Sequence, residues 1–177
     1  VPGLQEARGR LLPLAQKFAT LDSDTQAKYE DIKSSYSFGW SMGKEKLEGG
    51  KPDLSKGSYY ANPQYDKPVD DPELEKKYPA FLGTNIWPSE KDCPDFEKAF
   101  KSLGQLIVDV GMLVAQQCDG YVKKTCGAYE AGKLHRIIDS SLCCKARLLH
   151  YFSKDGGDDV GEMVDTEGFS SWCGWHN

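Results

Sequence analysis

The sequence predicts an α+β fold, in which a helical and loop-rich N-terminal region precedes a short run of strands. Apolar residues recur at three- and four-residue steps over residues 2–21 and again over 94–121, and this spacing is typical of helices. After residue 144 the spacing shortens to two, which is typical of a strand. We therefore expect an N-terminal helical and loop-rich region over 1–140 and a strand region over 141–177.

The first helix is predicted within residues 2–21. Its apolar residues fall on one helical face: Leu4, Ala7, Leu11, Leu14, Phe18 and Leu21. Pro13 lacks a backbone N–H and is expected to kink this helix or divide it in two. A second helix is expected to start near Ser23 or Asp24, since either side chain can cap a helix N-terminus, and to end before Tyr36.

Residues 36–88 are predicted to be an ordered, loop-rich region. Glycine, proline, asparagine and aspartate recur every few residues, as at Asn62-Pro63 and Asp71-Pro72, and these residues favour turns. Two short aromatic runs, at residues 58–60 and 81–82, are predicted to be brief strands between the turns. The many aromatic side chains argue against a flexible linker.

The longest helix is predicted over residues 94–121. Its apolar face comprises Phe96, Phe100, Leu103, Ile107, Val110, Val114, Cys118 and Tyr121. Pro94 suits the first position of a helix. At 1.5 Å per residue such a helix runs about 40 Å, which is long enough to back a whole sheet.

The remainder of the chain is predicted to contain one short helix and then strands. Residues 128–140 carry apolar residues at helical spacing. Residues 144–151 alternate and fit a strand with both faces partly covered. Residues 160–177 are rich in glycine and aromatic residues and are expected to supply one or two further short strands.

Composition narrows the possible functions. The formal net charge is -5 and no basic block is present, which disfavours a nucleic-acid surface built on phosphate neutralisation. The most apolar stretch, residues 103–115, is too short and too interrupted to cross a bilayer, so no membrane span is expected. The density of the six cysteines is low for a disulfide-stapled scaffold, which favours reduced thiols in an intracellular compartment, either the cytoplasm or the chloroplast stroma.

Five stretches carry a resemblance to a known family. They are residues 39–47 (GWSMGKEKL), 56–63 (KGSYYANP), 85–88 (NIWP), 147–152 (RLLHYF) and 172–177 (WCGWHN). In this order, and over almost the whole chain, the sequence resembles the plant and algal branch of the isopenicillin-N-synthase-like, iron(II)- and 2-oxoglutarate-dependent dioxygenases. The resemblance implies that residues 141–177 begin an incomplete double-stranded β-helix, or jelly roll.

The resemblance also implies site residues. The family binds iron through a His-x-Asp pair and a second, distant histidine, which leaves coordination positions open for 2-oxoglutarate and dioxygen. His176 matches the first histidine and Asn177 the intervening residue. The aspartate would follow Asn177 directly and the second histidine would lie further on. Iron(II) and 2-oxoglutarate are therefore expected in the complete protein, whereas this chain alone is expected to hold neither.

Tyr151 matches a tyrosine that contacts 2-oxoglutarate in relatives of this type, although it also fits an aromatic residue in the core of the barrel. Leu149 departs from the polar residue usual two positions before that tyrosine, which weakens the cosubstrate assignment. Arg147 is interpreted as a strand charge with a partner rather than as a ligand contact.

Two functions follow as hypotheses. In the first, the chain is the N-terminal part of an oxygenase that oxidises a small organic molecule, and this part alone has no turnover. In the second, the chain is a non-catalytic accessory subunit of a larger assembly. The exposed edge of an unfinished sheet would favour a protein partner in that case.

Overall fold

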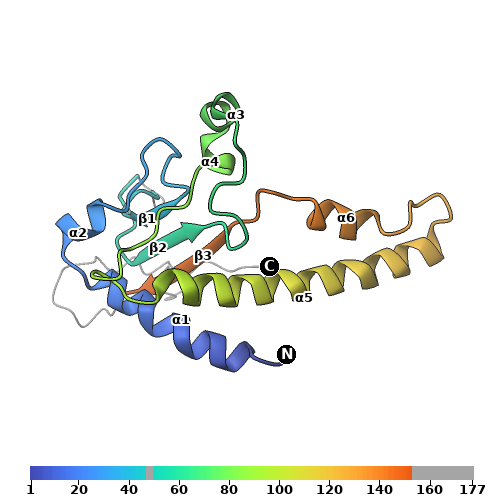
Figure 1. Ribbon diagram of the computed structural model, residues 1–177, viewed down its shortest axis with the longest axis horizontal. Helices are drawn as coiled ribbons and strands as arrows, with labels where there is room; N and C mark the ends of the chain where they lie inside the picture. The colour runs from blue at the N-terminus through green and yellow to red at the C-terminus, as the bar shows by residue number, and fades with distance from the viewer. Residues whose placement is uncertain (47–49, 153–177) are drawn as a thin grey trace, which may run out of the picture.

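The computed structural model describes residues 1–46 and 50–152 and contains a three-stranded antiparallel sheet with helices packed against it (Figure 1). The elements in chain order are α1 (Leu4–Ala19), α2 (Ser23–Ala27), β1 (Gly39–Met42), β2 (Lys56–Ala61), α3 (Pro72–Lys77), α4 (Pro79–Leu82), α5 (Phe96–Thr125), α6 (Lys133–Asp139) and β3 (Ala146–Tyr151). The mixed helix and sheet content confirms the predicted α+β class.

The sheet has the order β1-β2-β3, so the strand from the C-terminal region pairs with a strand from the loop-rich region. The register places Trp40 opposite Tyr59, and Tyr59 opposite Leu148. All three side chains are buried on the face that α1 and α5 cover. Because side chains alternate along a strand, the residues between them lie on the opposite face.

Aromatic side chains form the centre of the core. Phe18 of α1, Tyr59 of β2 and Phe96 of α5 meet with ring centroids 4.7 to 5.8 Å apart, in edge-on and tilted arrangements. Such pairs contribute about 0.5–1.5 kcal/mol each beyond the burial of their area. The Tyr59 hydroxyl donates a hydrogen bond of 2.6 Å to the carbonyl oxygen of Ile86, so the buried phenol is satisfied.

The N-terminal helices form where the apolar pattern indicates, with two corrections. α1 is one helix that contains Pro13, so the expected division at this proline is wrong. α2 begins at Ser23, but its N-cap is Asp22, whose carboxylate accepts a hydrogen bond of 2.9 Å from the backbone N–H of Thr25. Asp22 has the extended backbone that an N-cap needs, whereas Ser23 and Asp24 are already inside the helix.

The sequence pattern missed one strand in the loop-rich region, β1, and predicted another, at residues 81–82, where the structure has a helix. β1 was not predicted, because four residues beginning with a glycine give too short a pattern. The predicted strand at residues 81–82 is wrong: these residues lie in α4, which begins with Pro79 at its first position. Proline has a fixed φ that suits the first position of a helix. Because two residues are too few to show a period, this local preference determines the structure of residues 81–82.

Asn62 and Asn85 join two segments of the loop-rich region to each other and to the segment that precedes β3. The side chain of Asn85 accepts a hydrogen bond from the backbone N–H of Asn62 and donates to its carbonyl oxygen, both at 2.8 Å. The Asn62 side chain in turn donates to the carbonyl oxygen of Leu142, 80 residues away, also at 2.8 Å. Both asparagines are buried, and this pairing satisfies backbone groups that would otherwise lose their solvation.

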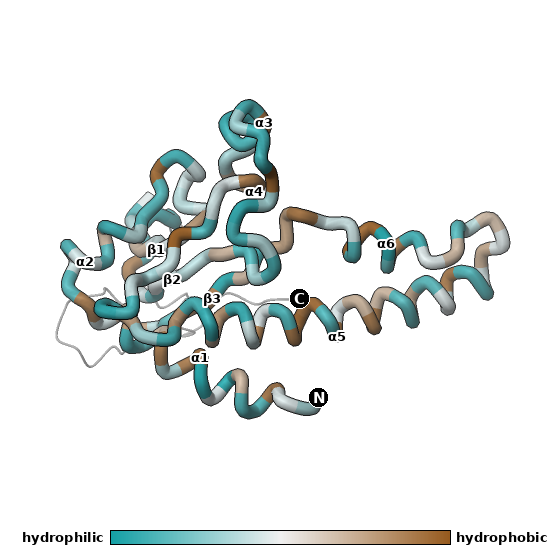
Figure 2. The backbone as a smooth tube through the Cα atoms, viewed as in Figure 1, coloured by the Kyte–Doolittle hydropathy of each residue, from teal (hydrophilic) through white to brown (hydrophobic). Residues whose placement is uncertain are grey.

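α5 extends far beyond the sheet (Figure 1). Its first three turns bury Phe96, Phe100 and Leu103 in the core, whereas Ile107 and Val114, on the same helical face, are exposed. Hydrophobic residues, brown in Figure 2, continue along the outer half of the helix. Within the described residues, the sheet and α1 therefore cover only the first part of this face. No helix among residues 1–46 and 50–152 is long and apolar enough to cross a membrane.

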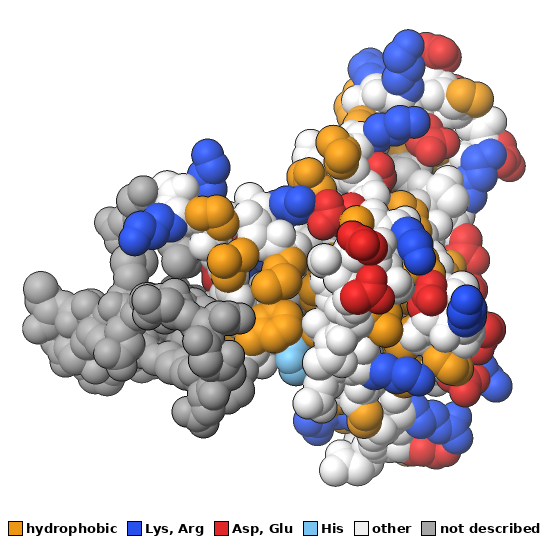
Figure 3. Space-filling view, turned by 90° about the vertical axis from the view of Figure 1, so that its left-hand side faces the viewer, with side chains coloured by type: hydrophobic (Ala, Val, Ile, Leu, Met, Phe, Trp, Pro, Cys, Tyr) orange, Lys and Arg blue, Asp and Glu red, His pale blue; other side chains and the backbone are white. Residues whose placement is uncertain are grey.

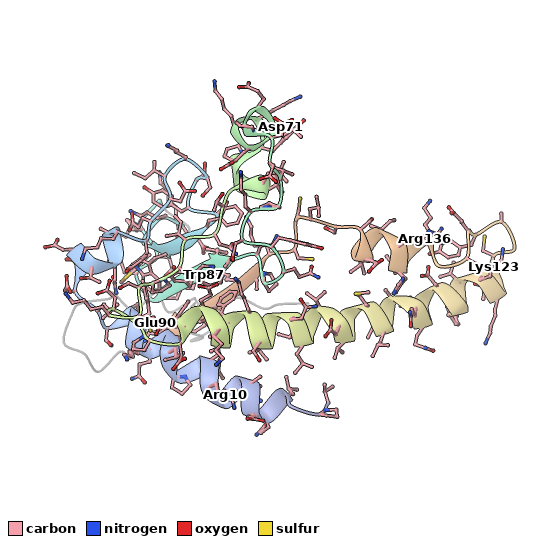
Figure 4. All side chains as sticks on the ribbon, viewed as in Figure 1. Arg10, Asp71, Trp87, Glu90, Lys123 and Arg136 are labelled. Atoms are coloured by element: carbon pink, nitrogen blue, oxygen red, sulfur yellow. The ribbon has the colours of Figure 1, made fainter. Side chains whose placement is uncertain are left out.

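The outer half of α5 is held by α6, which folds back on it. Asp119 of α5 is buried, and its carboxylate accepts hydrogen bonds of 2.9 Å from the backbone N–H groups of Leu134 and His135 and a further one from the Tyr129 hydroxyl. In the loop that joins α5 to α6, the carbonyl oxygens of Gly127 and Tyr129 accept hydrogen bonds from the Lys123 ammonium. Lys123 and Arg136 both lie well away from the sheet (Figure 4). Asp119 thus caps α6 from a neighbouring helix.

Candidate functional site

The face of the sheet opposite the helices carries most of the polar side chains of the strands. We call it the outer sheet face; its residues are Ser41, Lys56, Ser58, Tyr60, Arg147, Leu149 and Tyr151. The register pairs Tyr60 with Arg147, and Lys56 with Tyr151. Directly opposite side chains on one face of an antiparallel pair are close enough to interact.

Arg147 lies at the centre of this face and is held by three hydrogen bonds. Its guanidinium donates hydrogen bonds of 2.9 and 3.0 Å to the Ser58 hydroxyl and one of 2.6 Å to the Glu45 carboxylate. The guanidinium carbon also lies 5.2 Å from the centroid of the Tyr60 ring. These contacts confirm the interpretation of Arg147 as a strand charge with a partner.

Glu45, in the loop after β1, links the two cations of the outer sheet face. Besides Arg147, it contacts the Lys56 ammonium at 3.2 Å. Lys56 also forms a closer ion pair, of 2.7 Å, with Asp53, and this pairing raises the pKa of Lys56. Burial alone would raise the pKa of Asp53, but hydrogen bonds from Lys56 and Ser55 outweigh it and hold the pKa below its usual value. Asp53 and Lys56 are therefore both charged at neutral pH.

An open pocket of about 460 Å³ lies beside this network. Its lining is rich in hydroxyl groups and comprises Ser35, Tyr36, Ser37, Ser41, Lys44, Glu45, Tyr60 and Lys145. Lys44 is paired with Glu30 at 3.0 Å, and Lys145 donates to the carbonyl oxygen of Ala80 and lies 4.3 Å from the centroid of the Phe38 ring. Glu30 balances the charge of Lys44, whereas Lys145 forms no ion pair with a carboxylate among the described residues, so the pocket offers hydroxyls and one ammonium without a counter-charge.

Of the two residues that the resemblance implies, the structure places one. Tyr151 ends β3, is partly buried, and belongs to the outer sheet face. His176 lies outside the described residues. The neighbouring His150 belongs to the helix-covered face, packs edge-on against Phe152 with centroids 5.0 Å apart, and burial lowers its pKa, so its imidazole is neutral at pH 7.

Metal ligands do not gather in the part of the chain that the structure describes. No group of three or more histidine, cysteine, aspartate or glutamate side chains suited to a metal ion occurs among these residues. The five cysteines described are free thiols, and Cys93 is buried, which raises its pKa. A metal centre would therefore need ligands from outside the described residues, and the two cations of the outer sheet face, Lys56 and Arg147, are paired with carboxylates.

Sequence reasoning missed Glu45, Asp53 and Lys56 as members of the site. Each looks like an ordinary surface charge in a turn-rich segment. The pairing of β2 with both β1 and β3 brings Arg147 to Glu45, which is 102 residues distant in the chain. The alternation of residues 56–61 was a usable signal, because it places Lys56, Ser58 and Tyr60 on one face once the strand is extended beyond residues 58–60.

On the side of the molecule that Figure 3 shows, lysine and arginine side chains are interspersed with acidic ones, and hydrophobic side chains gather around a histidine. This view shows no extended area in which all charged side chains have the same sign.

Comparison with known proteins adds no relative: no protein-family model matches the chain, and no curated protein matches it.

Proposed function

We propose that the chain is the N-terminal part of a non-haem iron(II)- and 2-oxoglutarate-dependent oxygenase that acts on a small organic molecule. The proposal rests on the resemblance of five stretches of the sequence, in the same order, to the dioxygenase family named above. One structural observation supports it. The register places Tyr151 on the outer sheet face, away from the side that α1 and α5 cover, and a further layer of strands there could enclose it. A jelly-roll core built onto β3 would bring this face to its interior.

In such a protein Tyr151 would hold the cosubstrate. A phenol donates one hydrogen bond and is neutral at pH 7, so it can bind a carboxylate without adding charge. Lys56 lies opposite Tyr151 across the strands, but its ammonium is already paired with Asp53 and Glu45 and adds no net positive field for an anion. With iron and 2-oxoglutarate bound, dioxygen would be activated, and substrate oxidation would be coupled to the release of carbon dioxide and succinate. His176 would be one of the iron ligands, and the cytoplasm or chloroplast stroma is the proposed compartment.

Replacing Tyr151 by phenylalanine in the full-length gene product is expected to raise the KM for 2-oxoglutarate about tenfold or more. The hydroxyl would donate to a charged carboxylate, and hydrogen bonds to charged groups contribute about 1.5–3 kcal/mol. Succinate release, measured against 2-oxoglutarate concentration in iron(II), gives the KM. Tyr65→Phe is the matched control, because Tyr65 lies in a loop away from the outer sheet face and should leave the KM unchanged. An unchanged KM in both variants would refute the role of Tyr151.

A second candidate function, a non-catalytic accessory subunit, is favoured by one feature. Within the described residues β3 pairs only with β2, which leaves one edge of the sheet open to another chain. A full-length product that binds neither iron(II) nor 2-oxoglutarate, yet forms a stable complex with another protein through β3, would favour this candidate over the first.

A further inference from the structure

The pocket beside the outer sheet face contains an ammonium group that no carboxylate of the described residues balances. Lys145 lies just before β3 and lines this pocket of about 460 Å³. Its ammonium donates a hydrogen bond to the carbonyl oxygen of Ala80 and lies 4.3 Å from the centroid of the buried Phe38 ring. These neighbours hold the group in place, but neither carries a charge. Burial lowers the pKa of Lys145, as is usual for an ammonium that lacks a counter-charge.

The other charged groups around the pocket balance one another. They are acids and bases in contact: Glu30 with Lys44, and Glu45 and Asp53 with Lys56 and Arg147. Among the described residues around the pocket, the excess charge is therefore the single positive charge of Lys145. A ligand with one negative charge matches this excess. A phosphate monoester carries a charge of about −1.5 to −2, and its second charge would meet the Glu45 carboxylate without compensation.

Three serine hydroxyls of the pocket are available to a ligand. Ser35, Ser37 and Ser41 line the pocket, and within the described part of the chain none of their hydroxyls has a hydrogen-bond partner. Ser41 is only 9% exposed and contributes to the pocket from β1. Each hydroxyl can donate one hydrogen bond and also accept, so these serines suit both a carboxylate and the hydroxyl groups of a ligand.

The turn that carries two of these serines is strained. Ser35 and Tyr36 are consecutive residues in left-handed backbone conformations, with φ of 55° and 59°. Residues other than glycine rarely adopt this conformation, and where surrounding contacts hold it, it often occurs at ligand sites. Here the backbone N–H groups of Ser35 and Tyr36 donate to the carbonyl oxygens of Ile32, at 3.0 Å, and Asp31, at 2.8 Å. The strain is an observation independent of the charge, and it favours a functional site at the same place.

The pocket is separate from the position of Tyr151. It lies at the end of the sheet where β2 ends and β3 begins, whereas Tyr151 lies at the opposite end of β3. Lys145 and Tyr151 are six positions apart in the chain. In an extended strand this corresponds to about 20 Å at 3.3 Å per residue. Strands added at the open edge of β3 would extend the sheet away from β1 and from the turn at residues 35–37.

We propose that this pocket binds a small hydroxylated organic acid, with its carboxylate on Lys145 and its hydroxyl groups on Ser35, Ser37 and Ser41. An ammonium has three donors, so the one that Ala80 accepts leaves others for a carboxylate oxygen. The single charge of a carboxylate balances the excess positive charge, and hydroxyl groups of the ligand exchange hydrogen bonds with the serines. The proposal is independent of the proposed oxygenase activity, because the pocket is separate from Tyr151 and requires no metal.

Calorimetric titration of the full-length gene product with D-gluconate, acetate, D-glucose and inorganic phosphate tests this proposal. D-Gluconate has one carboxylate and several hydroxyls, and its dissociation constant is expected to be about 1 mM or lower. Acetate lacks the hydroxyls and should bind about threefold more weakly or worse, and uncharged D-glucose about tenfold more weakly or worse. Phosphate should bind no more tightly than acetate. Phosphate binding tighter than that of D-gluconate would assign the site to a phosphoryl group and overturn the proposal.

Two substitutions in the pocket and one outside it locate the binding. Lys145→Gln should weaken D-gluconate binding about tenfold or more, because a hydrogen bond between charged groups is lost. Lys124→Gln is the matched control: it removes the same charge from an exposed position near the end of α5 and should leave the affinity unchanged. Ser41→Ala should weaken binding about threefold or more, and it provides a second test if Lys145→Gln does not fold.

Protection from acetylation, measured by mass spectrometry, identifies the lysine that the ligand contacts. D-Gluconate should slow the acetylation of Lys145 by an amine-reactive ester and leave that of Lys124 unchanged. Absence of D-gluconate binding at about 10 mM overturns the proposal. So does binding that is unchanged in both Lys145→Gln and Ser41→Ala, or binding that leaves the acetylation of Lys145 as fast as before.

Discussion

Replacing Gly39 by alanine is expected to destabilise the protein by about 3–5 kcal/mol and to reduce its soluble yield sharply. Gly39 begins β1 with a φ of 70°, which side chains other than glycine rarely adopt. A Cβ atom there would lie 2.0 Å from the carbonyl oxygen of Tyr29. That oxygen accepts a hydrogen bond of 2.7 Å from the backbone N–H of Trp40, so relief of the clash would break the contact that places β1.

Gly120→Ala is the control for this substitution. Gly120 lies inside α5, where an added Cβ atom would meet no neighbouring segment within 4 Å, and alanine there should stabilise the helix by about 0.5–1 kcal/mol. Thermal unfolding of the two variants, followed by circular dichroism, gives the comparison. Equal stability of Gly39→Ala and the unchanged chain would show that the approach of Tyr29 to β1 is wrong.

Phe96→Ala is expected to cost about 3–5 kcal/mol of unfolding free energy. The Phe96 side chain has no exposed area, and its ring contacts those of Phe18, Tyr59, Trp87 and Phe100. Truncation would leave a cavity at the junction of α1, α5 and the sheet, which so densely packed a cluster cannot fill by relaxation. Urea unfolding measures the change as a shift of the midpoint at constant slope.

Phe81→Ala makes the matched control, because Phe81 lies in α4 and is 62% exposed. Its truncation should change the unfolding free energy by less than about 0.5 kcal/mol, as is usual for surface substitutions. If the two variants lose similar stability, Phe96 is not at the centre of the core and the packing of α5 on the sheet must be revised.

Long periodic segments were predictable from the sequence. The helix expected over residues 94–121 spans Phe96–Thr125, and the strand expected over 144–151 spans Ala146–Tyr151. In both, repetition over many residues outweighs local preference. Short elements were not predictable, because four residues at β1 and two at 81–82 give no period, and the capping by Asp22 depends on backbone angles.

Periodicity also cannot show where burial ends. The apolar face of α5 is continuous from Phe96 to Tyr121 in the sequence, yet within the described structure the core covers it only as far as Leu103 and Gly104. An apolar helix face indicates that burial against another surface is favourable, but it does not indicate which surface. The pattern therefore marks residues 107–121 as a face that favours a partner, and it does not show which segment or molecule supplies that partner.

The candidate site was predictable only in part. The resemblance selected Tyr151, and the alternation of β3 sets the face on which it lies. The surrounding charges were not predictable, because Glu45 and Arg147 meet through the pairing of β2 with both β1 and β3. The iron-binding role of His176 stays a prediction.

The measurement that tests the oxygenase proposal most directly is iron(II) binding by the full-length gene product, followed spectroscopically under anaerobic conditions. The account predicts one bound iron(II) per chain, a new absorption band when 2-oxoglutarate is added, and loss of both in a His176→Ala variant that remains folded. A folded full-length protein that binds no iron(II), or one whose iron binding is unaffected by His176→Ala, would contradict the proposal.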